Sequence, residues 1–158
     1  MRWVLQTECW LDGWGGNVKK PGSVPSRSIR VLVMDDNVDF AEFVCEVARH
    51  NNFNATAISN PKQFEERCTA IRPEIVVLDI QMPGIDGLQL AQWLGDFMLA
   101  KQLEVRLVIL SGRGEDAIQL CKSVAAISGI HEVQTLSKPV EFATLSKVLL
   151  SFAKDINC

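Results

Sequence analysis

The sequence predicts an α/β fold in which a doubly wound, five-stranded parallel sheet lies between two layers of helices. Short apolar runs alternate with segments of helical period, the alternation repeats five times, and three of the runs are almost continuously apolar. Alternating strands and helices are typical of parallel sheets covered on both faces, and right-handed crossovers wind such sheets in both directions. We therefore expect a three-layer sandwich.

The first two strand-helix units lie between residues 29 and 71. Ile29–Met34 is an apolar run, and a helix follows with apolar residues on one face at Phe40, Phe43, Val44, Val47 and Ala48. Asn54–Ser59 is a shorter, alternating strand. Asn60 and Pro61 predict a helix cap and a first-turn proline, and that helix carries Phe64, Cys68 and Ile71 on one face.

The remaining three units follow the same pattern. The predicted strands are Ile75–Ile80, Leu107–Leu110 and Val133–Leu136. Asp86-Gly87 is interpreted as a turn that opens the third helix. Apolar residues mark one face of the last three helices: Leu88, Ala91, Leu94 and Met98; Ile118, Cys121 and Ala125; and Phe142, Leu145, Leu149 and Phe152.

The strand composition also predicts the strand order. Strands buried on both faces are continuously apolar, whereas alternating strands suit the edges of a sheet. The first, third and fourth strands are continuous and the second and fifth are mixed. The pattern therefore favours the order 2-1-3-4-5, the flavodoxin-like (βα)5 three-layer sandwich.

Composition limits the possible classes of function. The chain has 158 residues, 47% apolar and 22% charged, with a net charge of -3, as in an ordinary soluble domain. Its basic residues are scattered, which argues against direct nucleic-acid binding, and no apolar run is long enough for a membrane span. The five cysteines form no metal-binding or disulfide pattern, so we expect a reducing, cytoplasmic location.

Residues 1–28 differ from the rest of the chain. They contain Trp3, Trp10 and Trp14, then a run rich in Gly, Pro and Ser, and no strand or helix period continues through them. We interpret them as a flexible or atypical N-terminal leader. The alternative is a docking segment whose tryptophans anchor on a partner.

Polar residues follow the predicted strands at one edge of the sheet. The first strand ends at Asp35 and Asp36, the third at Asp79, the fourth at Ser111 and the fifth at Lys138. Ligands bind beyond the carboxyl ends of the strands in such sheets. Taken alone, each residue has a structural interpretation: a helix cap for either aspartate of the pair, a turn for Ser111, or a solvated strand end for Lys138.

Together these residues predict phosphoryl-transfer chemistry. Three neighbouring carboxylates repel one another unless a cation compensates, and an all-oxygen site of this kind suits Mg²⁺. An ammonium and a hydroxyl add the positive charge and the donor that a phosphoryl group requires. Asp79, at the centre, is the natural nucleophile for an aspartyl-phosphate.

From about Ile29 to Lys154 the sequence resembles the receiver domains of two-component response regulators. The motifs VLVMDD, VVLDIQMPGIDG, VILSG and LSKP occur in the order of that family. The resemblance implies a receiver domain over residues 29–155 that catalyses only its own phosphorylation and dephosphorylation. Its phosphoryl donor would be a sensor histidine kinase or a histidine phosphotransfer protein.

The resemblance also implies roles for single residues. Asp79 would be the phosphoacceptor, and Asp35 and Asp36 would hold Mg²⁺ together with Asp79. Gln81 would add its backbone carbonyl as a further metal ligand. Ser111 occupies the place of the switch hydroxyl. Lys138 would bind a phosphoryl oxygen, with a cis bond to Pro139.

Three positions give two hypotheses about this chain in particular. Thr135 stands where many receivers have Tyr or Phe, so we expect a changed output surface; amide shifts on phosphorylation as wide as in aromatic-bearing relatives would contradict this. Gln81 and Arg113, two residues after Asp79 and Ser111, are expected to influence the hydrolytic water and so the lifetime of the phosphoryl group.

Three other functions are alternatives for a chain with this predicted fold. A phosphorylation-independent interaction module on the same fold usually lacks an acidic residue or the lysine, and all are present. An aspartate-dependent phosphohydrolase would carry its nucleophile in a D-x-D motif after the first strand. Flavin binding is disfavoured by the acidic loop after that strand. No output domain is expected within these residues, the downstream target is unknown, and a phosphorylation-dependent dimer is possible.

Overall fold

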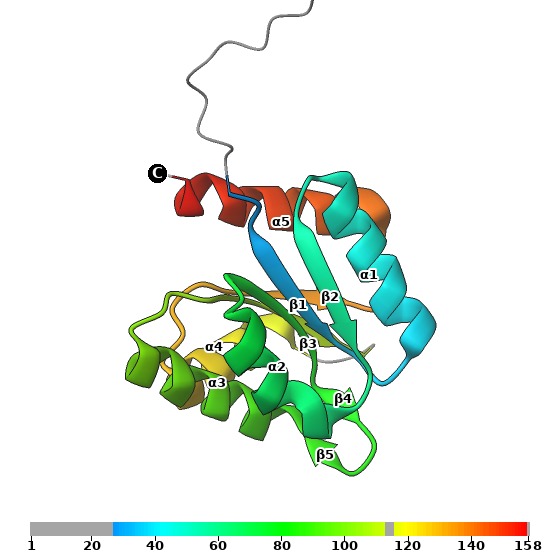
Figure 1. Ribbon diagram of the computed structural model, residues 1–158. Helices are drawn as coiled ribbons and strands as arrows, with labels where there is room; N and C mark the ends of the chain where they lie inside the picture. Colours follow the sequence, from blue (N-terminus) through cyan, green and yellow to red (C-terminus); the bar gives the residue numbers. More distant parts are fainter. Residues whose placement is uncertain (1–26, 113–115, 158) are drawn as a thin grey trace, which may run out of the picture.

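The computed structural model describes residues 27–112 and 116–157, and its five-stranded parallel sheet confirms the predicted fold (Figure 1). The strand order is β2-β1-β3-β6-β7, which is the predicted order 2-1-3-4-5 when the short β4–β5 hairpin is left out of the count. The sheet strands are β1 (Arg30–Met34), β2 (Asn54–Ile58), β3 (Ile75–Asp79), β6 (Arg106–Ser111) and β7 (Val133–Ser137).

Helices cover both faces of this sheet. They are α1 (Val38–His50), α2 (Phe64–Ile71), α3 (Gly87–Lys101), α4 (Ala117–Ser128) and α5 (Phe142–Ile156). α1 and α5 lie on one face, and α2, α3 and α4 on the other (Figure 1). Each face has its own apolar core, and every residue of β3 is buried, as expected for the central strand. Each buried aliphatic side chain contributes roughly 1.5–3 kcal/mol, so the strand ends are held on a rigid base.

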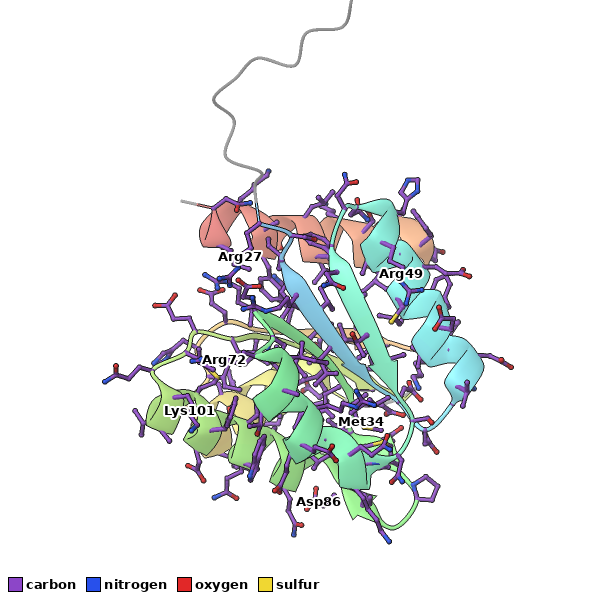
Figure 2. The ribbon with its side chains drawn as sticks, viewed as in Figure 1. Arg27, Met34, Arg49, Arg72, Asp86 and Lys101 are labelled. Carbon is purple, nitrogen blue, oxygen red and sulfur yellow. The ribbon has the colours of Figure 1, made fainter. Side chains whose placement is uncertain are left out.

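Short polar side chains begin the helices near the carboxyl edge of the sheet. Asn37 caps α1, since its side chain accepts a hydrogen bond from the Phe40 amide at 3.1 Å. Neither Asp35 nor Asp36 is therefore the cap of this helix, and both remain available for other contacts. Asp86 caps α3 by accepting from the Leu88 amide at 2.9 Å, as the sequence predicts (Figure 2).

The segment between β3 and α3 contains a feature that periodicity did not predict. Here β4 (Gln81–Met82) and β5 (Ile85–Asp86) form a two-stranded antiparallel hairpin. Gly87 follows it in close contact with the chain, because a β-carbon at Gly87 would lie 2.4 Å from Ile80 Cα. Two-residue strands are too short to produce an alternating pattern.

The second predicted helix begins later than expected. Asn60 and Pro61 start a single 3-10 turn, η1 (Pro61–Gln63), and α2 follows from Phe64. The Asn60 side chain accepts from the Lys62 amide at 3.1 Å, so the predicted cap is present but acts on the turn. Buried positions in α2 include Phe64 and Cys68, as the helical spacing indicates.

Within the described ranges, no helix is long and apolar enough to cross a membrane. Cys45 of α1 and Cys68 of α2 are buried free thiols. Residues 1–26 lie outside the described part of the chain, so the leader interpretation stays a prediction.

Candidate functional site

Three carboxylates meet at the carboxyl edge of the sheet. Asp35 and Asp36 directly follow β1, whose last residue Met34 is labelled in Figure 2, and Asp79 ends the neighbouring strand β3. One oxygen from each carboxylate can be chosen so that all three lie within 4.8 Å of one another. Asp35 is 0% and Asp79 3% exposed, whereas Asp36 is open to solvent. The cluster thus has a buried floor and one accessible side.

Lys138 joins the two buried carboxylates. Its Nζ lies 2.7 Å from Asp35 Oδ2 and 3.2 Å from Asp79 Oδ2. The same Nζ lies 4.5 Å from the ring centroid of Phe40, from the first turn of α1, a distance at which a cation is attracted to the ring face. The lysine is therefore held by two charges and one aromatic ring.

Backbone amides fix the orientation of the same carboxylates. The Asn37 amide donates to Asp35 Oδ1 at 2.9 Å, and the Gln81 amide donates to Asp79 Oδ1 at 2.9 Å. In each aspartate the other oxygen, Oδ2, faces Lys138. This arrangement orders both side chains before any ligand arrives.

Ser111 lies beside this cluster at the end of β6. It is 1% exposed, and its Oγ has no hydrogen-bond partner among the described residues. Leaving a buried hydroxyl without a hydrogen bond costs about 1–3 kcal/mol. A ligand that accepts from this hydroxyl, or a movement that brings it to an acceptor, would remove that cost. The Ser111 carbonyl accepts from the Lys138 amide at 2.9 Å, in register with the pairing of Ser111 and Ser137.

Burial and charge shift the protonation of the site in definite directions. Burial raises the pKa of Asp35 above its usual value of 3.8, and hydrogen bonds from Lys138 and the Asn37 amide only partly oppose this rise. For Lys138 burial alone would lower the pKa, but the hydrogen bond to Asp35 and the charges of Asp35 and Asp79 together raise it above 10.5. The ammonium therefore stays charged at neutral pH.

The six residues expected to bind the metal or the phosphoryl group are all described, and the structure brings most of them together. Asp35, Asp36, Asp79 and Lys138 share the cluster. Gln81 lies next to it and is exposed, and its Oε1 is so near Gly112 that a β-carbon there would lie 2.3 Å from it. The bond between Lys138 and Pro139 is cis, as predicted.

Some residues behave differently from the sequence interpretation, or fall outside the description. The sequence predicts Phe40 only as part of an apolar helix face, and its contact with Lys138 was missed. The signal for this contact is its position in the first turn of α1, three residues after the cap Asn37 and close to the acidic pair. Thr135 is half-buried in β7 and paired with Ile109. Arg113 belongs to residues 113–115, outside the described ranges.

The donor set fits a small, hard divalent cation. Carboxylate oxygens are the ligands that Mg²⁺ prefers, and an accessible side leaves room for the waters it keeps. The three acidic residues Asp35, Asp36 and Asp79 form such a group, with both buried and exposed members.

Comparison with known proteins places this geometry in a family. Residues 31–150 match the response regulator receiver domain family. Sporulation initiation phosphotransferase F of Bacillus subtilis (strain 168) is 27% identical over 100 residues, which cover 63% of this chain and 77% of that protein. Protein RcaC of Microchaete diplosiphon is 30% identical over 78 residues, which cover 49% of this chain but only 12% of that much longer protein.

Solved structures agree on the fold. The signal receiver domain of a response regulator from Bermanella marisrubri superimposes with a TM-score of 0.66 at 23% identity, covering 80% of this chain and 99% of that one. The residues that match the family include the carboxyl ends of β1, β3 and β6, where the acidic cluster and Ser111 lie. The chain therefore belongs to the response regulator receiver domain family.

Proposed function

We propose that this domain is a signalling switch that accepts a phosphoryl group on Asp79 in a Mg²⁺-dependent reaction. The observation that carries the proposal is the pairing of Lys138 Nζ with both Asp35 and Asp79, at 2.7 and 3.2 Å, beside a third carboxylate. We further propose residues 29–155 as the switch domain and residues 1–28 as a separate leader.

In the proposed reaction, an Asp79 carboxylate oxygen attacks the phosphorus of a phosphohistidine on a sensor kinase or phosphotransfer protein. An oxygen–phosphorus bond forms, the phosphorus–nitrogen bond breaks, and the histidine leaves with the electron pair. The Gln81 amide already holds Asp79 Oδ1, which limits rotation of the nucleophile. Pre-ordering of this kind reduces the entropic part of the barrier.

The other residues of the site would stabilise the transferred group. Bound Mg²⁺ would neutralise charge on the phosphoryl oxygens, and Asp35, Asp36, Asp79 and the backbone carbonyl of Gln81 are the proposed ligands. Lys138 would pair with a phosphoryl oxygen.

Ser111 would donate to another oxygen of the phosphoryl group. Its Oγ is buried without a partner among the described residues, so a new acceptor would remove an existing cost. A movement of Ser111 towards the phosphoryl group would shift the domain between two pre-existing states and change its surface for a downstream partner. The free buried thiols Cys45 and Cys68 agree with action in the cytoplasm.

The proposal is tested by incubating the full chain with acetyl phosphate, with and without Mg²⁺, and measuring its intact mass. We expect a gain of one phosphoryl group that requires Mg²⁺ and is lost in Asp79→Asn. Asp86→Asn is the matched control, because Asn is an equally good helix cap at this exposed position. The decay of the modified mass in Gln81→Ala measures the proposed influence of that side chain on lifetime.

Two outcomes would replace the proposal. No gain in mass by folded protein under any condition would favour a phosphorylation-independent interaction module on the same fold. Continued turnover of a phosphate ester, far beyond one equivalent, would indicate an aspartate-dependent phosphohydrolase.

A further inference from the structure

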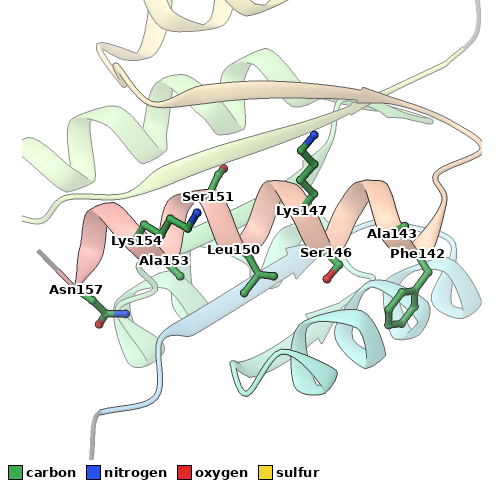
Figure 3. Close-up of a pocket in the computed structure, with 9 residues that line it drawn as sticks. All are labelled: Phe142, Ala143, Ser146, Lys147, Leu150, Ser151, Ala153, Lys154 and Asn157. Atoms are coloured by element: carbon green, nitrogen blue, oxygen red, sulfur yellow. The ribbon is translucent and has the colours of Figure 1, made fainter.

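An apolar groove follows the outer side of α5. Phe142, Leu150 and Ala153 form its floor, and Phe142 and Leu150 are each 43% exposed (Figure 3). The spacing of these residues places them on one face of the helix. The groove has a volume of about 880 Å³ and lies along almost the whole length of the helix. The groove therefore offers an apolar surface on which large side chains of another segment can pack.

The end of α1 borders this groove. The His50 ring packs edge-on against Phe142 at 5.2 Å between centroids, and Ser146 Oγ donates to Asn51 Oδ1 at 3.0 Å. Lys147 and Lys154 are exposed at the rim. The groove thus has an apolar floor, a polar wall and a basic rim, and it lies on the opposite face of the sheet from α3.

The chain enters the described structure at one end of the same groove. A neighbouring hollow is lined by Arg27 and Ser28, the first described residues, together with Leu150, Ala153 and Asn157 of α5. Ser28 Oγ donates to the Asn52 carbonyl at 2.9 Å, which fixes this point of entry. Whatever precedes Arg27 therefore starts beside the groove.

The preceding residues have the composition that such a groove requires. Trp3, Trp10 and Trp14 lie in a stretch that also contains Glu8 and Asp12. Tryptophan is a common anchor in apolar pockets, and the two acidic side chains complement the basic rim. We propose that residues 3–14 bind in the α5 groove of the same molecule, with tryptophan side chains on Phe142 and Leu150.

Reach and concentration favour this occupant over a second copy of the chain. α5 has 15 residues, about 22 Å at the helical rise. Trp14 is 13 positions before Arg27 and an extended chain covers about 3.3 Å per residue, so all three tryptophans can reach the groove. A tethered segment has an effective concentration on the order of millimolar, far above that of separate copies at micromolar protein.

Fluorine NMR of the full chain labelled with 5-fluorotryptophan tests the proposal. The four tryptophans give four signals, of which Trp93 reports on the fold because it stacks on Phe97 at 5.1 Å. We expect at least one of the other three signals to lie away from the free position and to show a reduced solvent-isotope shift. Leu150→Glu should return that signal to the free position, whereas Leu99→Glu, at the 82% exposed position on α3, should not.

A second variant changes the tryptophans and leaves α5 unaltered, so its result cannot come from a local distortion of this helix. Replacing Trp3, Trp10 and Trp14 by Ser changes no residue of the described domain, and it should shift the Leu150 amide resonance. Three results would overturn the proposal: three free tryptophan signals in the unmodified chain, equal release by both leucine substitutions, or signals that depend on protein concentration. The last result would assign the groove to a second copy.

Discussion

The three carboxylates of the cluster differ in their environment, and Lys138 contacts the two buried ones, Asp35 and Asp79. Asp35 is fully buried and its pKa is raised, chiefly by burial. Asp36 is exposed and remains hydrated. One lysine therefore compensates the two buried members, Asp35 and Asp79, and the exposed member adds further negative charge. In the absence of a divalent cation the cluster carries an excess of negative charge, which disfavours the ionised form of Asp35.

A substitution at Asp35 tests this imbalance. Because the pKa of Asp35 is raised above 3.8, the folded state keeps a proton that the unfolded state loses, and the free energy of unfolding falls as pH rises above 3.8. Asp35→Asn removes this loss, so we expect the variant to be more stable at neutral pH by on the order of 1 kcal/mol. Urea unfolding in magnesium-free buffer measures the difference, which should shrink as pH falls below 3.8.

The control for this prediction is Asp96→Asn, an exposed position on α3 outside the cluster. It should leave the free energy of unfolding within about 0.5 kcal/mol of the original. A destabilised Asp35→Asn at neutral pH would show that the ion pair with Lys138 outweighs the burial of charge.

At the scale of the elements, α3 and α4 are fitted to one another through a glycine. A β-carbon at Gly95 of α3 would lie 1.7 Å from the carbonyl oxygen of Ser128, the last residue of α4. Ser128 is itself fixed, since its Oγ donates to the Val124 carbonyl at 2.6 Å and accepts from the Ile130 amide at 3.1 Å. The contact joins backbone to backbone, so side-chain rotation cannot relieve it.

In Gly95→Ala, a higher helix propensity and a steric overlap with α4 change the free energy of unfolding in opposite directions. Alanine in a helix interior is normally favoured over glycine by about 1 kcal/mol, whereas overpacking costs about 1–3 kcal/mol or more. With an overlap this close to backbone atoms we expect overpacking to win and the variant to lose about 2 kcal/mol. Denaturant unfolding checks the sign, with exposed Asp96→Ala as the control on the same helix; a stabilised Gly95→Ala would mean that α4 moves freely.

The elements show which features the sequence could predict. Long apolar runs gave the sheet strands to within a residue or so at each end, because burial on both faces leaves an unambiguous pattern. The β4–β5 hairpin was missed because its two-residue strands have no period. The cap of α1 could not be chosen from the sequence, because three consecutive polar side chains, Asp35, Asp36 and Asn37, are all good caps and the backbone path selects Asn37.

The candidate site was predictable for a different reason. Parallel strands end at one edge of the sheet, so topology alone brings Asp35, Asp79, Ser111 and Lys138 together. The sequence could not predict the ring of Phe40 beside Lys138, or that the Ser111 hydroxyl has no hydrogen-bond partner in the part of the chain that the structure describes, since both depend on side-chain positions.

At the scale of the whole molecule, the sheet separates two apolar cores that each contain a cysteine. Cys45 of α1 lies in the core beneath α5, and Cys68 of α2 lies in the core shared with α3 and α4. Both are 0% exposed, and burial raises the pKa of Cys45 to about 11 and that of Cys68 to about 12. They report on opposite faces of the same sheet.

Alkylation of the two thiols tests whether the domain unfolds as one unit. Thiolate is the reactive form, so we expect the native protein to protect both cysteines from iodoacetamide by at least about a thousandfold, the scale of the folding equilibrium. Between pH 9.0 and about 11 the thiols ionise in the unfolded chain but stay protonated in the folded one. Rising pH therefore lowers the free energy of unfolding, and the protection of both cysteines should fall with it. Peptide mapping measures each site. Equal protection is expected, and clearly unequal values would indicate that one face opens alone.

The hydrogen bond between the Lys138 amide and the Ser111 carbonyl couples a displacement of one strand end to the other. It joins the end of β6, which carries the Ser111 hydroxyl, to the end of β7, which carries the Lys138 ammonium. Among the strands that the structure describes, β7 is the outermost on its side of the sheet and pairs with β6 alone. A shift of β7 would therefore disturb one row of backbone hydrogen bonds, whereas a shift of β1 or β3 would disturb two. The margin that ends in Lys138 is therefore easier to displace than the central strands β1 and β3, which carry the buried carboxylates.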